Sequence, residues 1–370
     1  MCIYTYISIL FLFLLFIELG LKNTKTSKYL FFIGAIILIL FIGLRSVNVG
    51  PDTIGYVAFF EGVSNGYGTY ENPNPDIEIG IVYFARFIRL ISTDYWVWLM
   101  FTTILTIGPF LYLVNIGSKV RMIPLLLVIV NTYGILYLAM ASMRQNLSLG
   151  FILLAFIVYY MSNVPKRKKI IVTITLILIA MLFHQAAILV LPFMLLCNVV
   201  SFKRNIVILM LVASIVLGLI ISDYAYSIFQ TLNFVTSIWG YSDRYFDYGK
   251  DAFATNTSFF YLAPVTLFVI SYVLCCEEKE MKEVRLKYLI LGCILFNLGS
   301  SLSVIMRVVY PLTMIGITYV PMNFIKKRKT IWQFFTILML IVFVILSFKN
   351  YSRMTTYDNN GIYPYTFFWE

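Results

Sequence analysis

The feature that most constrains this chain is a succession of long apolar runs that occupies most of its length. Of the 370 residues, 61% are hydrophobic and only 12% are charged, and the mean hydropathy is +0.89. A soluble core of this size has no use for so much apolar surface. A helix in a bilayer satisfies its own backbone hydrogen bonds, so the runs are expected to be spans. The sequence therefore predicts an all-α, polytopic membrane helix bundle in a single domain over residues 1–370.

Twelve apolar runs are expected to cross the membrane. They cover roughly residues 3–21, 29–44, 95–116, 121–140, 145–162, 169–183, 186–201, 205–222, 258–276, 288–304, 307–325 and 331–348. Several are shorter than the ~20 residues of a typical span, so tilt, local thinning of the bilayer or half-buried ends are expected.

Residues 77–91 decide the topology, because their apolar pattern is interrupted by Glu78, Arg86 and Arg89. If this segment crosses the membrane, the basic run 166–169 falls outside. If it lies on the membrane surface or re-enters, every basic cluster falls inside, with 19 of the 28 Lys and Arg inside and 9 outside. Cytoplasmic loops carry the excess of basic residues. We therefore expect a membrane-surface or re-entrant amphipathic helix here and both termini outside.

This topology gives three outer segments, namely the loops 45–94 and 223–257 and the tail 349–370. The net charge of +11 resides mainly in short clusters between the apolar runs, which is the positive-inside pattern and not a nucleic-acid-binding surface. Five cysteines show no spacing typical of disulfides or metal sites, and the chain has one histidine. No nucleotide-binding glycine-rich loop is found. We expect no metal, no cofactor and no nucleic acid.

Isolated ionisable residues gather at the expected outer ends of the spans. They are Arg45, Asp52, Glu78, Arg144, His184 and Arg307. A lone arginine costs about 2.5 kcal/mol or more in the bilayer centre, although any single one could be a snorkelling surface charge. Three arginines at one membrane face favour a common ligand. The planar guanidinium suits phosphate, so Arg45, Arg144 and Arg307 are candidate ligands of a lipid-linked diphosphate.

His184 is the only side chain here with an ordinary pKa near neutrality, and it is a candidate general base. Asp52 and Glu78 are its rivals for this role, and Asp52 could instead pair with Arg45 as a structural ion pair. Tyrosines interleaved with carboxylates and amides in the outer loops suit sugar binding, although an interfacial aromatic belt is the alternative. The sugar-binding candidates are Tyr56, Gln145, Arg244 and Tyr245.

These residues resemble a known family. The pattern Arg45-x4-Gly50-x-Asp52-Thr53-x2-Tyr56 is similar to the signature of EpsG-type proteins, which are related to Wzy-type polysaccharide polymerases. Further similar segments follow in the same order: Glu78-x-Gly80, Arg144-Gln145, His184-x-Ala186-Ala187 before Pro192, and Arg307 before Tyr310. Ala186 stands where serine is more usual in the family.

The resemblance implies a GT-C-like polymerase or ligase architecture in the bacterial cytoplasmic membrane, with the active site facing outside. Such a polymerase joins oligosaccharide repeat units, carried on undecaprenyl diphosphate, into exopolysaccharide, capsule or O-antigen. It implies a metal-independent, inverting displacement. The implied partners are the lipid-linked oligosaccharide, membrane lipid, a chain-length regulator and a flippase.

Other functions are compatible with parts of this pattern. An O-antigen ligase would have a similar architecture, and a flippase or transporter would bind the same lipid-linked unit without making a bond. Transporters place ionisable groups near the bilayer midplane, whereas these cluster at one face. An outer-face acyltransferase would also use a lone histidine, but it has no evident need for three arginines from distant spans.

Overall fold

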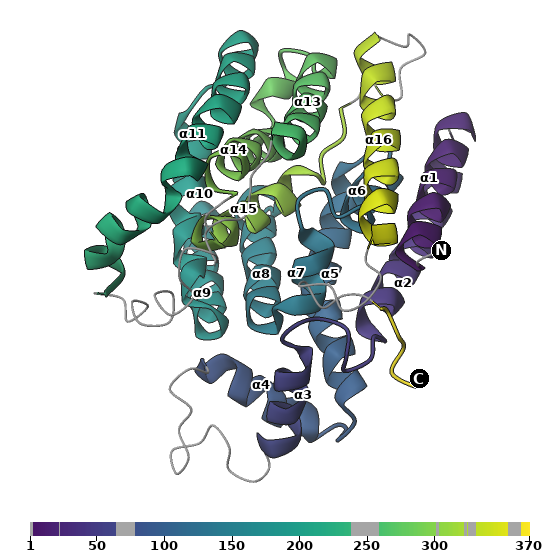
Figure 1. Cartoon of the computed structure of the whole chain (residues 1–370), viewed down its shortest axis with the longest axis vertical. Coiled ribbons are helices and arrows are strands. Elements are labelled where there is room, and N and C mark those ends of the chain that lie inside the picture. Colours follow the sequence, from purple (N-terminus) through teal and green to yellow (C-terminus); the bar gives the residue numbers. More distant parts are fainter. Residues whose placement is uncertain are drawn as a thin grey trace.

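The computed structural model describes residues 3–21, 23–63, 78–237, 259–300, 303–321, 324, 331–353 and 364–370, which form a helical bundle (Figure 1). The α-helices are α1 (Ile3–Leu21), α2 (Thr24–Gly43), α3 (Thr53–Gly62), α4 (Ile79–Arg89), α5 (Tyr95–Gly117), α6 (Met122–Ile129), α7 (Ile135–Ala141), α8 (Met143–Phe156), α9 (Lys166–Phe183), α10 (Val190–Val199), α11 (Arg204–Ser237), α13 (Phe259–Cys275), α14 (Val284–Gly299), α15 (Ser303–Gly316) and α16 (Ile331–Arg353). Shorter turns are the π-helix η2 (Ile157–Met161) and the 3-10 helices η3 (Gln185–Leu189) and η5 (Glu280–Lys282). No β-strand occurs among these residues, and an isolated bridge joins Arg45 to Phe367.

The predicted all-α membrane architecture is confirmed, but twelve full-length spans are not found. Among the described residues, six helices are long and apolar enough to cross a membrane. They are Ile3–Leu21, Thr24–Gly43, Tyr95–Gly117, Met143–Met161, Arg204–Ser222 and Ile331–Lys349. The expected span 121–140 is instead two short helices, α6 and α7. The helix is interrupted between them by a turn in which Asn131 and Gly134 adopt positive φ angles of 54° and 73°.

The expected outer segment 223–257 begins as helix, because α11 continues without a break to Ser237, although the apolar span within it ends at Ser222 as predicted. Polar residues such as Ser222 and Asp223 do not end a helix on their own when no proline or glycine follows them. The rest of that loop lies outside the described residues.

Within the expected segment 77–91, residues Ile79–Arg89 form the short helix α4, as the amphipathic pattern predicts. Its 11 residues rise about 16 Å, roughly half the ~30 Å of a bilayer core, so α4 cannot cross on its own. One face is buried and contains Ile81, Ala85 and Ile88, whereas Tyr83 and Phe87 are exposed. Together with α3, this helix covers the lower end of the bundle in Figure 1.

A second, smaller hydrophobic cluster lies under α3 and α4 and is separate from the main core. At its centre Phe60 stacks on the fully buried Trp98, with ring centroids 4.8 Å apart. The guanidinium of Arg89 lies over the Phe60 ring, 5.4 Å from its centroid, and also donates to the backbone carbonyl oxygen of Phe60 at 2.9 Å. The two short helices are thereby fixed to the start of α5.

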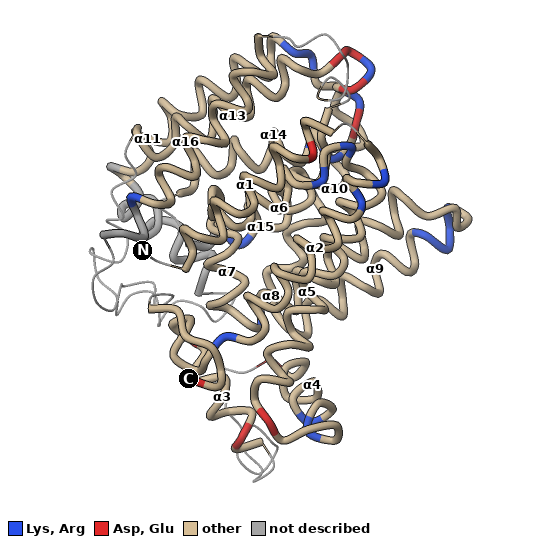
Figure 2. The backbone as a smooth tube through the Cα atoms, turned by 90° about the vertical axis from the view of Figure 1, so that its right-hand side faces the viewer, with Lys and Arg blue, Asp and Glu red and all other residues tan. Residues whose placement is uncertain are grey.

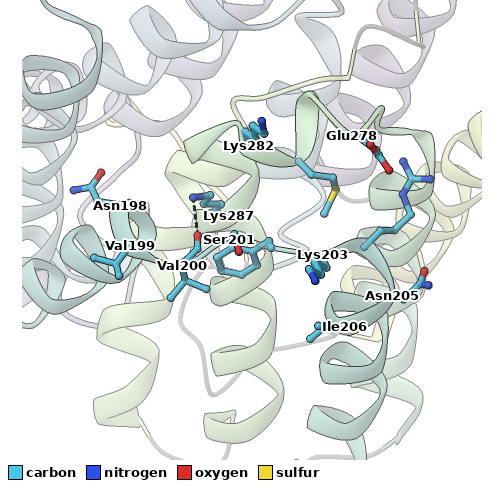
Figure 3. A pocket seen from close by; sticks show the side chains of 13 residues that line it. Asn198, Val199, Val200, Ser201, Lys203, Asn205, Ile206, Glu278, Lys282 and Lys287 are labelled. Carbon is cyan, nitrogen blue, oxygen red and sulfur yellow. Dashed lines mark hydrogen bonds between the residues drawn. The ribbon is translucent and has the colours of Figure 1, made fainter.

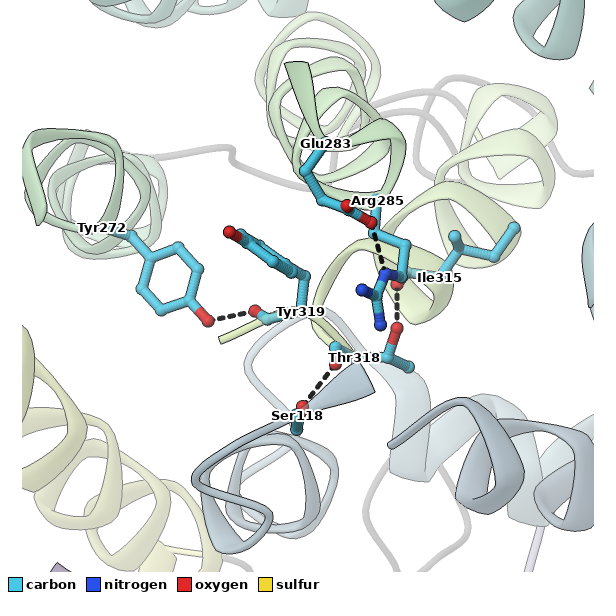
Figure 4. A network of polar contacts seen from close by, with 7 residues as sticks. All are labelled: Ser118, Tyr272, Glu283, Arg285, Ile315, Thr318 and Tyr319. Atoms are coloured by element: carbon cyan, nitrogen blue, oxygen red, sulfur yellow. Dashed lines mark hydrogen bonds and ion pairs between the residues drawn. The ribbon is translucent and has the colours of Figure 1, made fainter. Parts of the chain in front are cut away.

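Helix α5 extends from one end of the bundle to the other. It begins beside α3 and α4 and rises about 34 Å over 23 residues. Its last residue, Gly117, lies against the side chain of Arg285. At this far end Arg285 Nε pairs with Glu283 at 2.7 Å and the guanidinium lies over Tyr319, as Figure 4 shows. Tyr272 donates to the carbonyl oxygen of Tyr319, so α13, α14 and the segment after α15 are tied together.

Three of the basic clusters expected in the inner loops, at residues 119–121, 203–204 and 279–287, lie at that same far end. Backbone N–H groups at Arg121 and Met122 donate to Glu18 at 2.8 and 2.9 Å, which joins the start of α6 to the end of α1. Lys287 donates to two carbonyl oxygens between α10 and α11, and Arg204 donates to the carbonyl oxygen that follows α13. In Figure 2 this end carries alternating basic and acidic residues, far from α3 and α4.

We predict that Gly50→Ala destabilises the protein. Gly50 has a φ of +106°, and a Cβ there would lie 2.2 Å from the carbonyl oxygen of Met140. A left-handed backbone alone costs a residue with a Cβ about 1–2 kcal/mol. The midpoint of thermal unfolding in detergent should therefore fall.

Gly55→Ala is the matched control, because a Cβ at this helical position meets nothing within 4 Å and alanine favours helix. Its unfolding midpoint should stay level or rise. An unchanged midpoint in Gly50→Ala would contradict the observed loop conformation.

Candidate active site

The side chain of Arg45 stabilises the loop after α2 through hydrogen bonds to backbone carbonyl oxygens. This side chain is almost fully buried, with 1% exposed. Its Nη1 donates to the carbonyl oxygen of Ile42 at 2.7 Å, and its Nε donates to that of Val49 at 3.2 Å. Burial lowers the pKa of Arg45 to about 10, so the guanidinium stays charged at neutral pH. The structure thus places Arg45 inside its own loop and apart from the other candidate residues.

The same loop is pressed against the end of α7. Thr53, fully buried, donates to the carbonyl oxygen of Val49 at 2.8 Å and lies 3.2 Å from that of Met140. Because only glycine tolerates the contact at position 50, the loop approaches α7 closely. Arg144, the first site residue of α8, follows the end of α7 by three residues, so the loop brings its own polar residues beside α8.

Arg144, the second residue of α8, links α3 and the start of α4. Its Nε donates to the hydroxyl oxygen of Tyr56 at 2.9 Å, and its Nη1 forms an ion pair with Glu78. Asp52, exposed just before α3, lies within the electrostatic reach of Arg144. No ion pair joins Asp52 to Arg45 among the described residues, so the structural pairing considered for them is not observed.

Gly80 brings Glu78 to His184. A Cβ on Gly80 would lie 2.6 Å from the carbonyl oxygen of Leu182, so α4 can pack onto the end of α9 only because this residue is glycine. The packing sets Oε1 of Glu78 3.5 Å from Nδ1 of His184. This is an ion-pair distance, longer than a hydrogen bond, and such contacts are often long in unliganded sites.

His184 stands at the break between α9 and η3, where its extended backbone (φ −160°, ψ 113°) ends the helix. Its side chain is 12% exposed. Burial lowers the pKa of His184, the charges of Arg307 and Arg144 lower it further, and Glu78 opposes them. The imidazole is therefore neutral at pH 7 and can accept a proton.

Glu78 is the ionised member of this pair. Burial alone raises the pKa of Glu78, but its contact with His184 and the charge of Arg144 outweigh burial and hold the pKa below its usual value. A carboxylate beside Nδ1 holds the proton there, which leaves Nε2 as the basic nitrogen.

His184 also lines a small pocket, to which Glu78 does not contribute. Its polar lining comes from three segments, namely α8, the break after α9, and α15, and consists of Gln145, Ser148, His184, Arg307 and Tyr310. Nε2 of Gln145 and Nε2 of His184 are buried, with no hydrogen-bond partner in the described part of the chain. Buried polar groups are normally satisfied, so these atoms are suited to a ligand.

The structure therefore brings together most of the predicted site residues, and three of the predicted residues are not part of this cluster. Brought together are Tyr56, Glu78, Arg144, Gln145, His184 and Arg307, with Asp52 at the edge. Arg45 is separate, and Arg244 and Tyr245 lie outside the described residues. Sequence reasoning did not propose Ser148 or Tyr310 as site residues. Helical spacing could have indicated them, because residues three or four apart share a helix face. Ser148 follows Arg144 by four residues, and Tyr310 follows Arg307 by three.

No group of three or more His, Cys, Asp and Glu side chains that could hold a metal ion is found in the described ranges. The chemistry available at the site is that of a neutral imidazole, a carboxylate and two guanidinium groups. Such a set can take a proton from a hydroxyl group and bind an anionic leaving group.

Fold and site together define a multi-pass helical membrane protein with a cluster of ionisable groups at one end of its bundle. Residues 28–367 match the EpsG family, so the chain belongs to this family of Wzy-type polysaccharide polymerases. The matched range runs from the first turns of α2 to the tail and contains every residue of the cluster. No curated protein and no solved structure is significantly similar to the chain. The resemblance inferred from the motifs is confirmed.

The chain has one histidine, so its imidazole gives a single signal in a nuclear magnetic resonance titration. We predict that Glu78→Gln lowers the pKa of His184, because Glu78 raises it. Arg307→Gln should raise the same pKa, because the charge of Arg307 lowers it.

Arg86→Gln is the control, since this exposed residue lies on the outer face of α4 and should leave the titration unchanged. If neither Glu78→Gln nor Arg307→Gln moves the midpoint, these side chains do not surround His184.

Proposed function

We propose that this protein joins oligosaccharide repeat units carried on undecaprenyl diphosphate into exopolysaccharide, capsule or O-antigen. The observation that carries the proposal is the meeting of Glu78, Arg144, His184 and Arg307 from four distant segments at one end of the bundle. Family membership supports polysaccharide polymerase activity. The cluster supports a glycosyl transfer that needs a base and an anion-binding site.

The site faces the outside of the bacterial cytoplasmic membrane in this proposal. The supporting observation is that the basic clusters at residues 119–121, 203–204 and 279–287 lie at the end opposite the site. Loops rich in Lys and Arg stay on the cytoplasmic side. A GT-C-like arrangement of the spans would present the site to a lipid-linked substrate whose tail remains in the bilayer.

His184 acts as the general base. Its Nε2 takes the proton of the acceptor hydroxyl, the resulting oxygen attacks the anomeric carbon of the growing chain, and the bond to the lipid diphosphate breaks. Glu78 holds the imidazole through Nδ1 and stabilises the imidazolium that forms. Attack opposite the leaving group inverts the anomeric centre, and no step requires a metal ion.

Arg144 and Arg307 bind the diphosphate and stabilise the charge that develops on it as it leaves. Arg45 has a different task, because it shapes the loop that carries Asp52 and Tyr56. Asp52 at the rim and Gln145 in the pocket are placed to bind hydroxyl groups of the acceptor sugar. A flippase that delivers the repeat units and a chain-length regulator are the expected partners.

We predict that Arg144→Ala abolishes polymer formation from purified lipid-linked repeat units, while the protein remains inserted and abundant. The readout is a ladder of chain lengths on a gel. Arg86→Ala, an exposed arginine on α4, should give the wild-type ladder.

A wild-type ladder from Arg144→Ala would remove its proposed role in binding diphosphate. Transfer to a different acceptor without a ladder would identify a ligase. Movement of the lipid-linked unit across the membrane without any new bond would identify a transporter.

The pH dependence of kcat/KM tests the base. Only neutral His184 accepts a proton, and its pKa lies below 6.5, so the rate should stay constant as pH falls to about that value and decline below it. An acid limb with its midpoint above pH 7 would contradict the assignment. The same limb in the residual activity of His184→Gln would also contradict it.

A further inference from the structure

A second cavity, unrelated to the candidate active site, lies at the opposite end of the bundle. It has a volume of about 960 Å³ and lies between the segment joining α10 to α11 and the segment joining α13 to α14 (Figure 3). Cavities of roughly 300–1,000 Å³ are typical of ligand sites. Nothing in the proposed glycosyl transfer uses this cavity.

The charges around this cavity are mainly positive. Lys203, Arg204, Lys282 and Lys287 line it, and Glu278 is the only acidic residue in its lining. In Figure 3 Lys203 and Lys282 come from its two different walls. Four cations facing one carboxylate favour an anionic ligand.

Two of these cations are held in place by the backbone. Lys287 donates to the carbonyl oxygens of Cys197 and Val200 at 2.7 and 2.8 Å, and its ammonium lies 5.7 Å from the centre of the Phe202 ring. Arg204 donates through Nη2 to the carbonyl oxygen of Cys276. The cavity wall is therefore rigid before any ligand arrives, which lowers the entropic cost of binding.

Arg204 also has a donor that is not used by the protein. Its Nε is buried and has no hydrogen-bond partner in the described ranges. A guanidinium presents its N–H groups as a fork that matches two oxygens of a phosphate. The guanidinium in the lining, together with the two exposed lysines Lys203 and Lys282, suits a phosphate group in particular.

The apolar side chains beside the cations indicate where such a phosphate comes from. Val199 is 84% exposed and Ile206 is 52% exposed, and both line the cavity. A soluble phosphate would gain nothing from them. A phospholipid would place its headgroup among the cations and an acyl chain along these side chains.

We propose that this cavity binds the phosphate headgroup of an anionic phospholipid from the leaflet opposite the active site. The bound lipid would join the start of α11 to the start of α14. These two helices pack against each other further along, where Asn297 donates to Ser214 at 2.8 Å, and α14 packs on α15, which carries Arg307. Lipid binding therefore stabilises the helix pair on which the Arg307 side of the active site rests.

The test is a lipid titration of the purified full-length protein in detergent, with the unfolding midpoint and native mass spectrometry as readouts. Phosphatidylglycerol should raise the midpoint and remain bound, whereas phosphatidylcholine at equal concentration should do neither. The double variant Lys203→Ala and Lys282→Ala should weaken phosphatidylglycerol binding roughly tenfold.

The matched control is Lys166→Ala with Lys168→Ala, which removes two exposed lysines at the same end but outside the cavity. Equal effects of both lipids on the wild-type protein would overturn the proposal, even if a variant fails to fold. So would equal losses in both double variants. Inorganic phosphate at millimolar concentration should not displace the lipid, and full displacement would assign the cavity to a soluble phosphate instead.

Discussion

The site depends on the carboxylate of Glu78, which contacts both the guanidinium of Arg144 and the imidazole of His184. Its two oxygens face Arg144 on one side and His184 on the other, so one acidic residue aligns groups from α8 and from the break after α9. Glu78 is the carboxylate that contacts both Arg144 and His184, so it balances positive charge where these two side chains meet. Burial and the charges of Arg307 and Arg144 keep His184 neutral by lowering its pKa, and Glu78 opposes them while it pairs with Arg144.

Two glycines make this arrangement sterically possible. Gly50 lets the loop after α2 press against α7, and Gly80 lets α4 pack on α9. Each brings a polar residue to α8, namely Tyr56 from the loop side and Glu78 from the α4 side. The tail adds to this, because Ser46 and Thr366 bond through both backbone and side chain. The site is thus built from short, irregular segments clamped onto long, regular helices.

Much of this could be predicted from the sequence, and the remainder depends on tertiary contacts. The spans 3–21 and 95–116 correspond almost residue for residue to α1 and α5, because uninterrupted apolar runs leave few alternatives. The run 121–140 was predicted to be one helix and is two, because the break in its middle depends on the backbone angles of Asn131 and Gly134. The role of Arg45 was not visible either. From the sequence, an isolated arginine at the end of a span was interpreted as a ligand-binding residue. In the structure, Arg45 donates instead to the carbonyl oxygens of Ile42 and Val49.

The central claim is that one diphosphate binds between Arg144 and Arg307 while His184 faces the acceptor. The most direct test is an experimental structure, in a lipid nanodisc, of the protein bound to an undecaprenyl-diphosphate-linked oligosaccharide. This account predicts diphosphate density within hydrogen-bond distance of both guanidinium groups, with a sugar hydroxyl beside Nε2 of His184. Diphosphate density at the opposite end of the bundle, or contact with neither arginine, would contradict it.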